Sequence, residues 1–214
     1  MILPNFVVIE GCDGSGTTTA LEGLKRRHGA EPGLAGTVPL FATREPSPGP
    51  VGLFIRRVLR GELSVEKETL ARLFAADRGE HLHAPGGLLE RCRRGELAVS
   101  DRYIPSSLVY QGLECGRELP EALNAPFPQP ELLIYLDIDP QTAMDRIERR
   151  SPGEREIYEK ADFLAKVRGA YRELLPQLER DGVRVLSLDG TRPPEEVGEA
   201  IWRAVREMPI MRGK

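Results

Sequence analysis

Five short apolar runs divide the chain, and each is mostly unbroken and rich in Val, Ile or Leu. Such runs are typical of strands that other elements cover on both faces of a parallel sheet. The predicted strands are Phe6–Glu10, Val38–Thr43, Leu97–Ser100, Leu132–Asp137 and Val183–Leu188.

Segments with helical periodicity separate these strands, and Pro- and Gly-rich clusters at Pro46–Pro50 and Pro126–Pro130 predict loops. Alternating strands and helices imply right-handed crossovers, and hence an α/β fold in three layers with helices flanking a five-stranded parallel sheet. Without repeats or linkers, residues 1–214 form one predicted domain. The predicted helices are Thr18–His28, Val51–Arg60, Val65–Cys92 with a break at Pro85-Gly86-Gly87, Pro140–Arg150, Lys160–Asp181 and Glu195–Glu207.

Composition narrows the possible partners. The chain has 214 residues, 40% hydrophobic and 29% charged, which is typical of a globular domain. Its net charge of -3 provides no overall attraction to nucleic acid polymers or anionic membranes, so phosphate recognition requires locally placed cations.

No apolar stretch approaches the roughly 20 residues that span a bilayer. Cys12, Cys92 and Cys115 lack metal-ligand spacing, and we expect reduced thiols and a cytoplasmic protein.

A glycine-rich loop follows the first predicted strand and precedes a helix. Its Gly11-x4-Gly16 spacing fits the Walker A pattern, in which backbone N–H groups and a helix N-terminus hold phosphates. The residue after Gly16 is normally Lys, but here it is Thr17; Thr18 then occupies the position of the Mg²⁺-binding hydroxyl. Alone, the loop is equally compatible with a turn that binds no phosphate. The predicted ATP-binding residues are Gly11, Gly14, Ser15, Gly16, Thr17, Thr18 and Thr19, in a P-loop NTPase-type fold.

Charged residues end two other predicted strands. Arg44 ends the second strand, at the sheet edge that faces the ligand crevice, where a guanidinium can grip a phosphate. Asp101 and Arg102 follow the third strand, where the carboxylate could hold Mg²⁺ through water and the guanidinium could contact a phosphate. Each of these residues could instead form an ordinary ion pair.

An aromatic residue and an arginine share one face of a predicted helix. Phe74 and Arg78 are four residues apart, so a base could stack on the ring while the guanidinium binds its edge. A core Phe beside a solvated Arg would produce the same spacing.

A basic segment follows the fourth predicted strand. Arg146, Arg149, Arg150 and Arg155 surround Ser151-Pro152-Gly153, and a segment of about residues 149–162 could act as a lid that closes over ATP. A solvated basic helix end is the alternative interpretation.

The order and spacing of these motifs resemble the thymidylate kinase family from end to end. The resemblance is carried by GCDGSG at 11–16, TREP at 43–46, LFAADR at 73–78, DRYIPSSLVYQG at 101–112, YLDIDP at 135–140 and RRSPGER at 149–155. It implies transfer of the γ-phosphoryl of ATP to dTMP with Mg²⁺ as cofactor, and a homodimer.

The resemblance also implies a role for each matching position. Asp13 would lie near the deoxyribose and the acceptor phosphate, while Arg44 and Arg102 would bind that phosphate. Around the thymine and sugar it implies Phe74 for stacking, Arg78 for a base carbonyl, Ser107 and Gln111 for the base edge, and Tyr110 beside the deoxyribose. Asp189–Pro193, which contains Arg192, would lie against the adenine.

Two positions depart from the family pattern. Thr17 replaces the lysine, and the lid reads Glu154-Arg155-Glu156-Ile157 where many members have Asp-Arg-x-Glu. Bacterial-type members carry catalytic arginine in the lid, and Gly14, where the other type has Arg, agrees with that. We therefore expect lid cations to replace the lysine; the candidates are Arg149, Arg150, Arg155 and Lys160.

Two other functions remain compatible with the sequence. Deoxynucleoside kinases also use a strand-end Asp-Arg pair, so the acceptor could be a nucleoside or another monophosphate. A non-catalytic nucleotide-binding protein would explain Thr17. Apolar residues on the Val51–Arg60 helix, such as Leu53 and Phe54, fit a dimer interface and core packing equally well.

Overall fold

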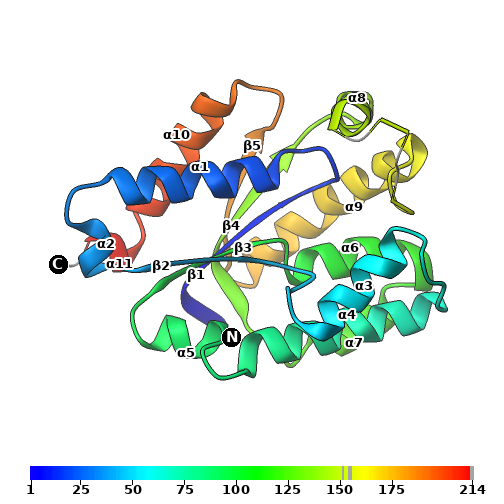
Figure 1. Ribbon diagram of the computed structural model, residues 1–214, viewed down its shortest axis with the longest axis horizontal. Helices are drawn as coiled ribbons and strands as arrows, with labels where there is room; N and C mark the ends of the chain where they lie inside the picture. The colour runs from blue at the N-terminus through cyan, green and yellow to red at the C-terminus, as the bar shows by residue number, and fades with distance from the viewer. Residues whose placement is uncertain (151, 154–155, 213–214) are drawn as a thin grey trace.

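The computed structural model describes residues 1–150, 152–153 and 156–212. Its core is a five-stranded parallel sheet in the order β2-β3-β1-β4-β5, flanked by helices (Figure 1). All five predicted strands are present, and the predicted α/β fold is confirmed. The strands are β1 (Ile2–Gly11), β2 (Leu40–Arg44), β3 (Leu97–Asp101), β4 (Gln129–Asp137) and β5 (Arg184–Asp189).

The start of β4 differs from the sequence prediction, which placed Pro126–Pro130 in a loop. Gln129 and Pro130 pair with Ile2 and Leu3, so both strands begin earlier than their apolar runs indicate. The pairing shifts register between Leu3 and Val7, and Asn5 within this stretch has φ 65°. Pro130 is tolerated in the strand because strand pairing is irregular at this point and Pro lacks only the backbone N–H donor.

The predicted helices are also present, with the break at Pro85-Gly86-Gly87 separating two of them. They are α1 (Thr17–Ala30), α3 (Pro50–Leu59), α4 (Lys67–His83), α5 (Leu88–Arg93), α8 (Pro140–Arg150), α9 (Ala161–Arg180) and α10 (Pro194–Arg206). Four helices were not predicted: α2 (Leu34–Thr37), α6 (Ile104–Cys115), α7 (Glu118–Asn124) and α11 (Pro209–Arg212). In α6, buried Ser107 and Gln111 interrupt the apolar face, which hides its periodicity.

Alternate strand residues pack on opposite faces of the sheet. In β1, Val7 and Ile9 contact the layer that contains α1 and α10, whereas Phe6 and Val8 contact the layer that contains α5 and α6 (Figure 1). Burial on both faces explains why the strands read as continuous apolar runs. Within the described residues, no helix combines the length and apolar character that crossing a bilayer requires.

The sheet register brings polar strand ends together. Asp101 at the end of β3 pairs with Ile9 of β1 and with Arg44 at the end of β2. The glycine-rich loop leaves β1 at the same edge, between its neighbours β3 and β4. In open α/β sheets ligands bind outside these carboxyl ends, so the fold places the predicted motifs around one crevice.

Candidate active site

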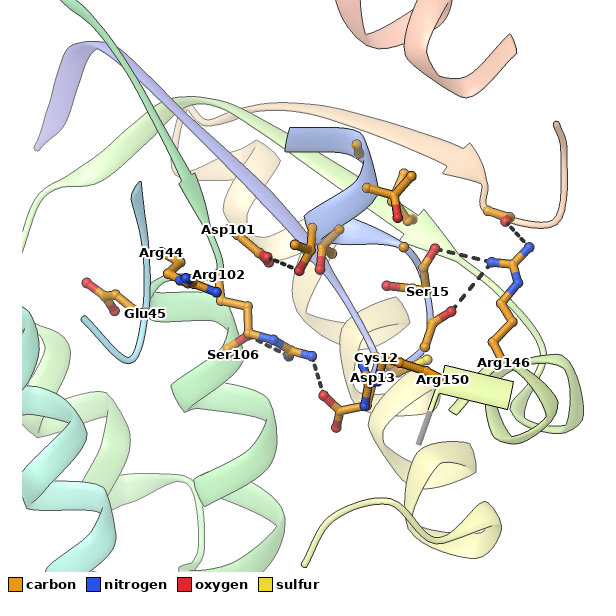
Figure 2. Close-up of a pocket in the computed structure, with 18 of the residues that line it drawn as sticks. Cys12, Asp13, Ser15, Arg44, Glu45, Asp101, Arg102, Ser106, Arg146 and Arg150 are labelled. Carbon is orange, nitrogen blue, oxygen red and sulfur yellow. Dashed lines mark hydrogen bonds and ion pairs between the residues drawn. The ribbon is translucent and has the colours of Figure 1, made fainter. Parts of the chain in front are cut away.

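A cavity of about 1370 Å³ opens at the carboxyl edge of the sheet. It is lined by the glycine-rich loop, the ends of β2 and β3, parts of α3 and α6, and residues around the predicted lid. Figure 2 shows the strand-end residues Arg44, Asp101 and Arg102 on one side of the loop and Arg146 on the other. The cavity therefore joins motifs that lie far apart in the sequence.

The glycine-rich loop has the conformation of a phosphate cradle. Gly14 and Gly16 have φ 80° and 97°, which L side chains rarely adopt, and α1 begins directly after them. A Cβ at Gly14 would lie 2.5 Å from the carbonyl oxygen of Ala143 on α8, so no larger residue fits without a shift. The Ser15 hydroxyl is buried and, in the described part of the chain, has no hydrogen-bond partner. Unpaired N–H groups at the start of α1 complete an anion site.

Thr17 is the first residue of α1, is 7% exposed and lines the cavity. Its backbone N–H is available there, but its hydroxyl carries no charge and is much shorter than a lysine side chain. Among the described residues, every basic side chain that lines the cavity is an arginine: Arg26, Arg27, Arg44, Arg56, Arg60, Arg102, Arg146, Arg150 and Arg192. The positive charge that these residues bring to the cavity is therefore carried by guanidinium groups.

Thr18 and Asp101 form an oxygen-rich pair beside the loop. The Thr18 hydroxyl donates to Asp101 Oδ2 at 2.6 Å, while Asp101 Oδ1 is buried and lacks a partner among the described residues. An unpaired buried carboxylate oxygen beside a hydroxyl suits Mg²⁺, which prefers oxygen ligands and retains several waters. In the part of the chain that the structure describes, no cluster of three or more His, Cys, Asp or Glu could hold a metal ion.

Asp13 and Arg102 form an ion pair in the lining of the cavity. Arg102 Nη2 donates to Asp13 Oδ1 at 2.6 Å and Arg102 Nη1 donates to Ser106 Oγ at 3.2 Å (Figure 2). The Tyr110 hydroxyl donates to Asp13 Oδ2 at 3.1 Å. Burial acts to lower the pKa of Arg102, but Tyr110 and Asp13 raise it above its ordinary value, so the guanidinium stays charged.

Arg44 and Arg56 bring two further cations to the part of the cavity next to β2 and α3, which is called the acceptor side below. Arg44 is exposed at the end of β2, and Arg56 on α3 donates to the carbonyl of Pro46. Burial and the neighbouring charge of Arg44 lower the pKa of Arg56. Two like charges held together favour an anion between them.

A buried polar network lies beside this acceptor side. Arg78 is 1% exposed; its Nη2 donates to Glu45 Oε2 at 2.7 Å and to Ser107 Oγ at 3.1 Å, and its Nη1 donates to Asn124. His81 Nδ1 lies 3.1 Å from Glu45 Oε1. Glu45 lines the cavity, so this network fixes a carboxylate on the cavity wall.

The predicted lid contacts α3 and α6 beside the cavity. Arg150 Nη2 contacts Glu159 Oε1 at 2.7 Å, and the Ile157 N–H donates to the carbonyl of Leu59 at 3.0 Å. The Tyr158 ring lies 5.3 Å from that of Tyr110, between ring centroids. Ile157 and Tyr158 therefore join the segment to α3 and α6, while Arg150 is paired within the segment.

The comparisons with known proteins agree with this geometry. The family model described as "Thymidylate kinase" matches residues 9–201. The chain belongs to the thymidylate kinase family. It is 41% identical over 208 residues to "Probable thymidylate kinase" of Pyrobaculum aerophilum, covering 94% of this chain and 98% of that protein. It is 34% identical over 197 residues to "Thymidylate kinase" of Leptospira interrogans, covering 91% and 90%. A provisionally named thymidylate kinase of Treponema pallidum is 36% identical over 208 residues, covering 96% and 97%.

Most of the site residues predicted for a thymidylate kinase line the cavity. They are Asp13, Gly14, Ser15, Gly16, Thr17, Thr18, Thr19, Arg44, Phe74, Asp101, Arg102, Tyr110, Gln111, Arg150 and Arg192. Gly11, Arg78, Ser107 and Arg149 are absent from the lining formed by the described residues, and Arg155 lies outside those residues. Direct contacts of these five with nucleotide stay predictions.

The sequence did not identify several residues of this thymidylate kinase site. Glu45 and Arg56 line the cavity and Glu10 is fully buried, but neither periodicity nor spacing assigned a role to any of the three. Arg146 was noted only as part of the basic segment. Its Nη2 donates to the carbonyl of Gly190 at 2.9 Å, and its Nη1 lies 3.4 Å from that of Ser15 (Figure 2).

Proposed function

We propose that this protein transfers the γ-phosphoryl of ATP to dTMP and releases ADP and dTDP. The single observation that carries the proposal is one cavity that combines the glycine-rich loop with the acceptor-side set Arg44, Phe74, Arg102 and Gln111. Membership of the thymidylate kinase family supports the choice of dTMP. The finer assignments below rest on this activity.

The acceptor oxygen needs no general base, because the phosphate of dTMP is already ionised near neutral pH. Arg44 and Arg102 hold that phosphate so that one oxygen attacks the γ-phosphorus while the bond to the ADP oxygen breaks. Asp13 holds the Arg102 guanidinium toward the acceptor. The chain contributes alignment and charge, not covalent chemistry.

We propose Thr18 and Asp101 as the residues that hold Mg²⁺, which neutralises charge on the ATP phosphates when bound. The hydroxyl would bind directly and the carboxylate through water. The buried, unpaired Oδ1 of Asp101 supports this assignment. Backbone N–H groups of the loop and the N-terminus of α1 bind the phosphates themselves.

The lid supplies the cation that Thr17 cannot. Arg150 lines the cavity, and its side chain is 61% exposed despite the contact with Glu159, so it can turn toward the β- and γ-phosphates. Arg149, Arg155 and Lys160 are the other candidates. Closure of this segment would also exclude water, which limits wasteful hydrolysis of ATP.

The base and sugar subsite accounts for the choice of acceptor. Phe74, Tyr110 and Gln111 line the cavity. Phe74 would offer a face for thymine and Gln111 a polar edge, and Tyr110 would pack beside the deoxyribose and crowd a ribose 2′-hydroxyl. Arg78 and Ser107 act here through Glu45 or by direct contact after a side-chain shift.

The test is an ADP-release assay with ATP and Mg²⁺, using dTMP, thymidine, dUMP and UMP as acceptors. We expect turnover with dTMP and little or none with thymidine or UMP. Turnover with thymidine instead of dTMP would indicate a deoxynucleoside kinase. Saturable dTMP binding without turnover would leave a binding protein on a kinase scaffold. The same assay on Thr17→Lys measures how fully the lid compensates.

A homodimer through the α3 and α6 side of the molecule is also proposed. Leu53 and Phe54 on α3 are 55% and 38% exposed, and Leu113 on α6 is 39% exposed, although large apolar side chains favour burial. Light scattering after size exclusion should report twice the chain mass, and Leu53→Asp should shift it toward monomer. A cytoplasmic location stays a prediction from the sequence.

A further inference from the structure

A fully buried carboxylate lies one residue before the glycine-rich loop. Glu10 at the end of β1 is 0% exposed and accepts hydrogen bonds at both oxygens. Its donors are the N–H of Tyr103 at 2.9 Å, the N–H of Ser106 at 3.2 Å, the hydroxyl of Ser106 at 2.7 Å and the hydroxyl of Tyr171 at 2.8 Å. Burial raises the pKa of Glu10, while the charge of Arg102 and these hydrogen bonds act to lower it.

Ser106 connects this buried carboxylate to the cavity. Its hydroxyl hydrogen is donated to Glu10, so its oxygen accepts from Arg102 Nη1 at 3.2 Å. The other end of the Arg102 guanidinium reaches Asp13 at 2.6 Å (Figure 2). The chain of contacts therefore runs from Glu10 through Ser106 to the cation proposed to bind the acceptor phosphate.

The backbone of Arg102 has a strained conformation and is held by contacts of its own. Its φ is 70°, a left-handed conformation that costs energy for a residue with a Cβ. The Arg102 N–H donates to the carbonyl of Ile9 at 2.9 Å, and the hydroxyl of Ser100 donates to the Arg102 carbonyl at 2.7 Å. These contacts hold the backbone, but the direction of the guanidinium depends on Ser106 and Asp13.

Tyr171 is the member of this network that comes from a different part of the fold. It lies on α9, the helix that begins where the predicted lid ends, whereas Glu10 and Ser106 belong to β1 and α6. Tyr171 is 0% exposed, and its ring centroid lies 4.9 Å from that of Tyr135. Its hydroxyl reaches Glu10 at 2.8 Å and lies 3.1 Å from Ser106 Oγ.

From this juxtaposition we infer that Tyr171 is a positioning residue for the acceptor phosphate: its hydroxyl fixes Glu10 and Ser106, which in turn fix the Arg102 guanidinium. Without the Tyr171 hydroxyl, Ser106 would be the remaining side chain that donates to Glu10 Oε2. The Ser106 hydroxyl could then rotate away from Arg102. The inference rests on the proposed function, since it assigns the phosphate of dTMP to Arg102.

The test uses Tyr171→Phe, which removes one oxygen and keeps the ring packed on Tyr135. Affinities for dTMP and thymidine are measured by calorimetry on the full chain, with thymidine reporting base and sugar contacts alone. We expect dTMP affinity to fall about five- to tenfold with thymidine affinity unchanged. We also expect kcat to fall while the KM for ATP is unchanged.

Tyr103→Phe is the matched control, because the Tyr103 hydroxyl is buried without a hydrogen-bond partner among the described residues. It should leave both affinities unchanged. Ser106→Ala removes the same link from the other side and should lower dTMP affinity like Tyr171→Phe, with no further loss in the double variant. It also serves if Tyr171→Phe fails to fold.

The inference is overturned if folded Tyr171→Phe and Ser106→Ala retain the ratio of dTMP to thymidine affinity of the unmodified protein. It is also overturned if both ligands weaken equally, since that indicates a general loss of packing. An unmodified protein that binds dTMP without turnover would refute the kinase assignment, while the affinity ratio would still decide the role of Tyr171.

Discussion

The hydroxyl of Thr18 donates to the carboxylate of Asp101 at 2.6 Å, although the two residues are 83 positions apart in the sequence. The pair joins the first turn of α1 to the end of β3. It places an oxygen of each side chain at the point where the proposed Mg²⁺ would meet the phosphates of ATP. A substitution of either side chain can therefore be tested by the Mg²⁺ concentration that the reaction needs, as well as by kcat.

Asp101→Asn should lower kcat by about 10²-fold and raise the Mg²⁺ concentration needed for half-maximal rate. The amide keeps the size of the side chain but removes the charge that holds the metal water. Asp137→Asn is the control, since Asp137 ends β4 but does not line the large cavity within the described chain. Unchanged Mg²⁺ dependence in Asp101→Asn would contradict the assignment.

Arg150→Ala should lower kcat by roughly 10²-fold, and by more than Arg149→Ala, because only Arg150 of the two lines the cavity described here. Adding Thr17→Lys to Arg150→Ala should restore part of the rate if the two cations replace each other. The substitution also leaves Glu159, which is 2% exposed, without this ion pair, so thermal unfolding must be measured alongside. Equal losses at Arg149 and Arg150 would remove the support for a specific lid cation.

Gly14→Ala should raise the KM for ATP by about tenfold and destabilise the fold by about 1–3 kcal/mol. The residue has φ 80°, and the new Cβ would lie 2.5 Å from the carbonyl oxygen of Ala143. Gly29→Ala in α1, where a Cβ meets no atom within 4 Å in the described structure, should instead raise stability by up to about 1 kcal/mol. Calorimetric unfolding and ATP kinetics on both variants separate the two expectations.

The three cysteines should differ in their reaction with iodoacetamide at pH 8. Burial raises the pKa of Cys12 and of Cys92 to about 12, which leaves roughly 10⁻⁴ of each as thiolate. Cys115 is only half-buried and should be modified first, although burial also raises its pKa. Peptide mass spectrometry measures the order in which the three cysteines are modified. Early labelling of Cys12 in the folded protein would contradict the buried position of this loop residue.

Asp137→Asn should cost about 1 kcal/mol of stability at neutral pH, with a smaller effect at acidic pH. Arg168 and Arg172 contact the carboxylate at 2.7 and 2.9 Å. Burial raises the pKa of Asp137, but these hydrogen bonds outweigh it and the pKa lies below its ordinary value. A depressed pKa adds stability above the unfolded value near 3.9 and loses it as pH falls through the folded value. Urea unfolding at both pH values checks the sign.

Tertiary packing explains the gaps in the sequence prediction. The periodicity of α6 was hidden because Ser107 and Gln111 are buried for polar contacts, where an amphipathic pattern places apolar residues. Arg78 was expected at a base carbonyl, but its spacing from Phe74 could not show that Glu45, Ser107 and Asn124 surround it. Those partners come from three other segments of the chain.

The sequence by itself determined the five strands, the main helices, the glycine-rich loop and the motifs of the thymidylate kinase family. Those features are local, because periodicity and spacing follow from residues near one another. Only the tertiary structure decided that Glu10, Ser106 and Tyr171 form one network behind Arg102, and that Thr18 meets Asp101. Such contacts depend on strand order and on how helices pack, which no local pattern records.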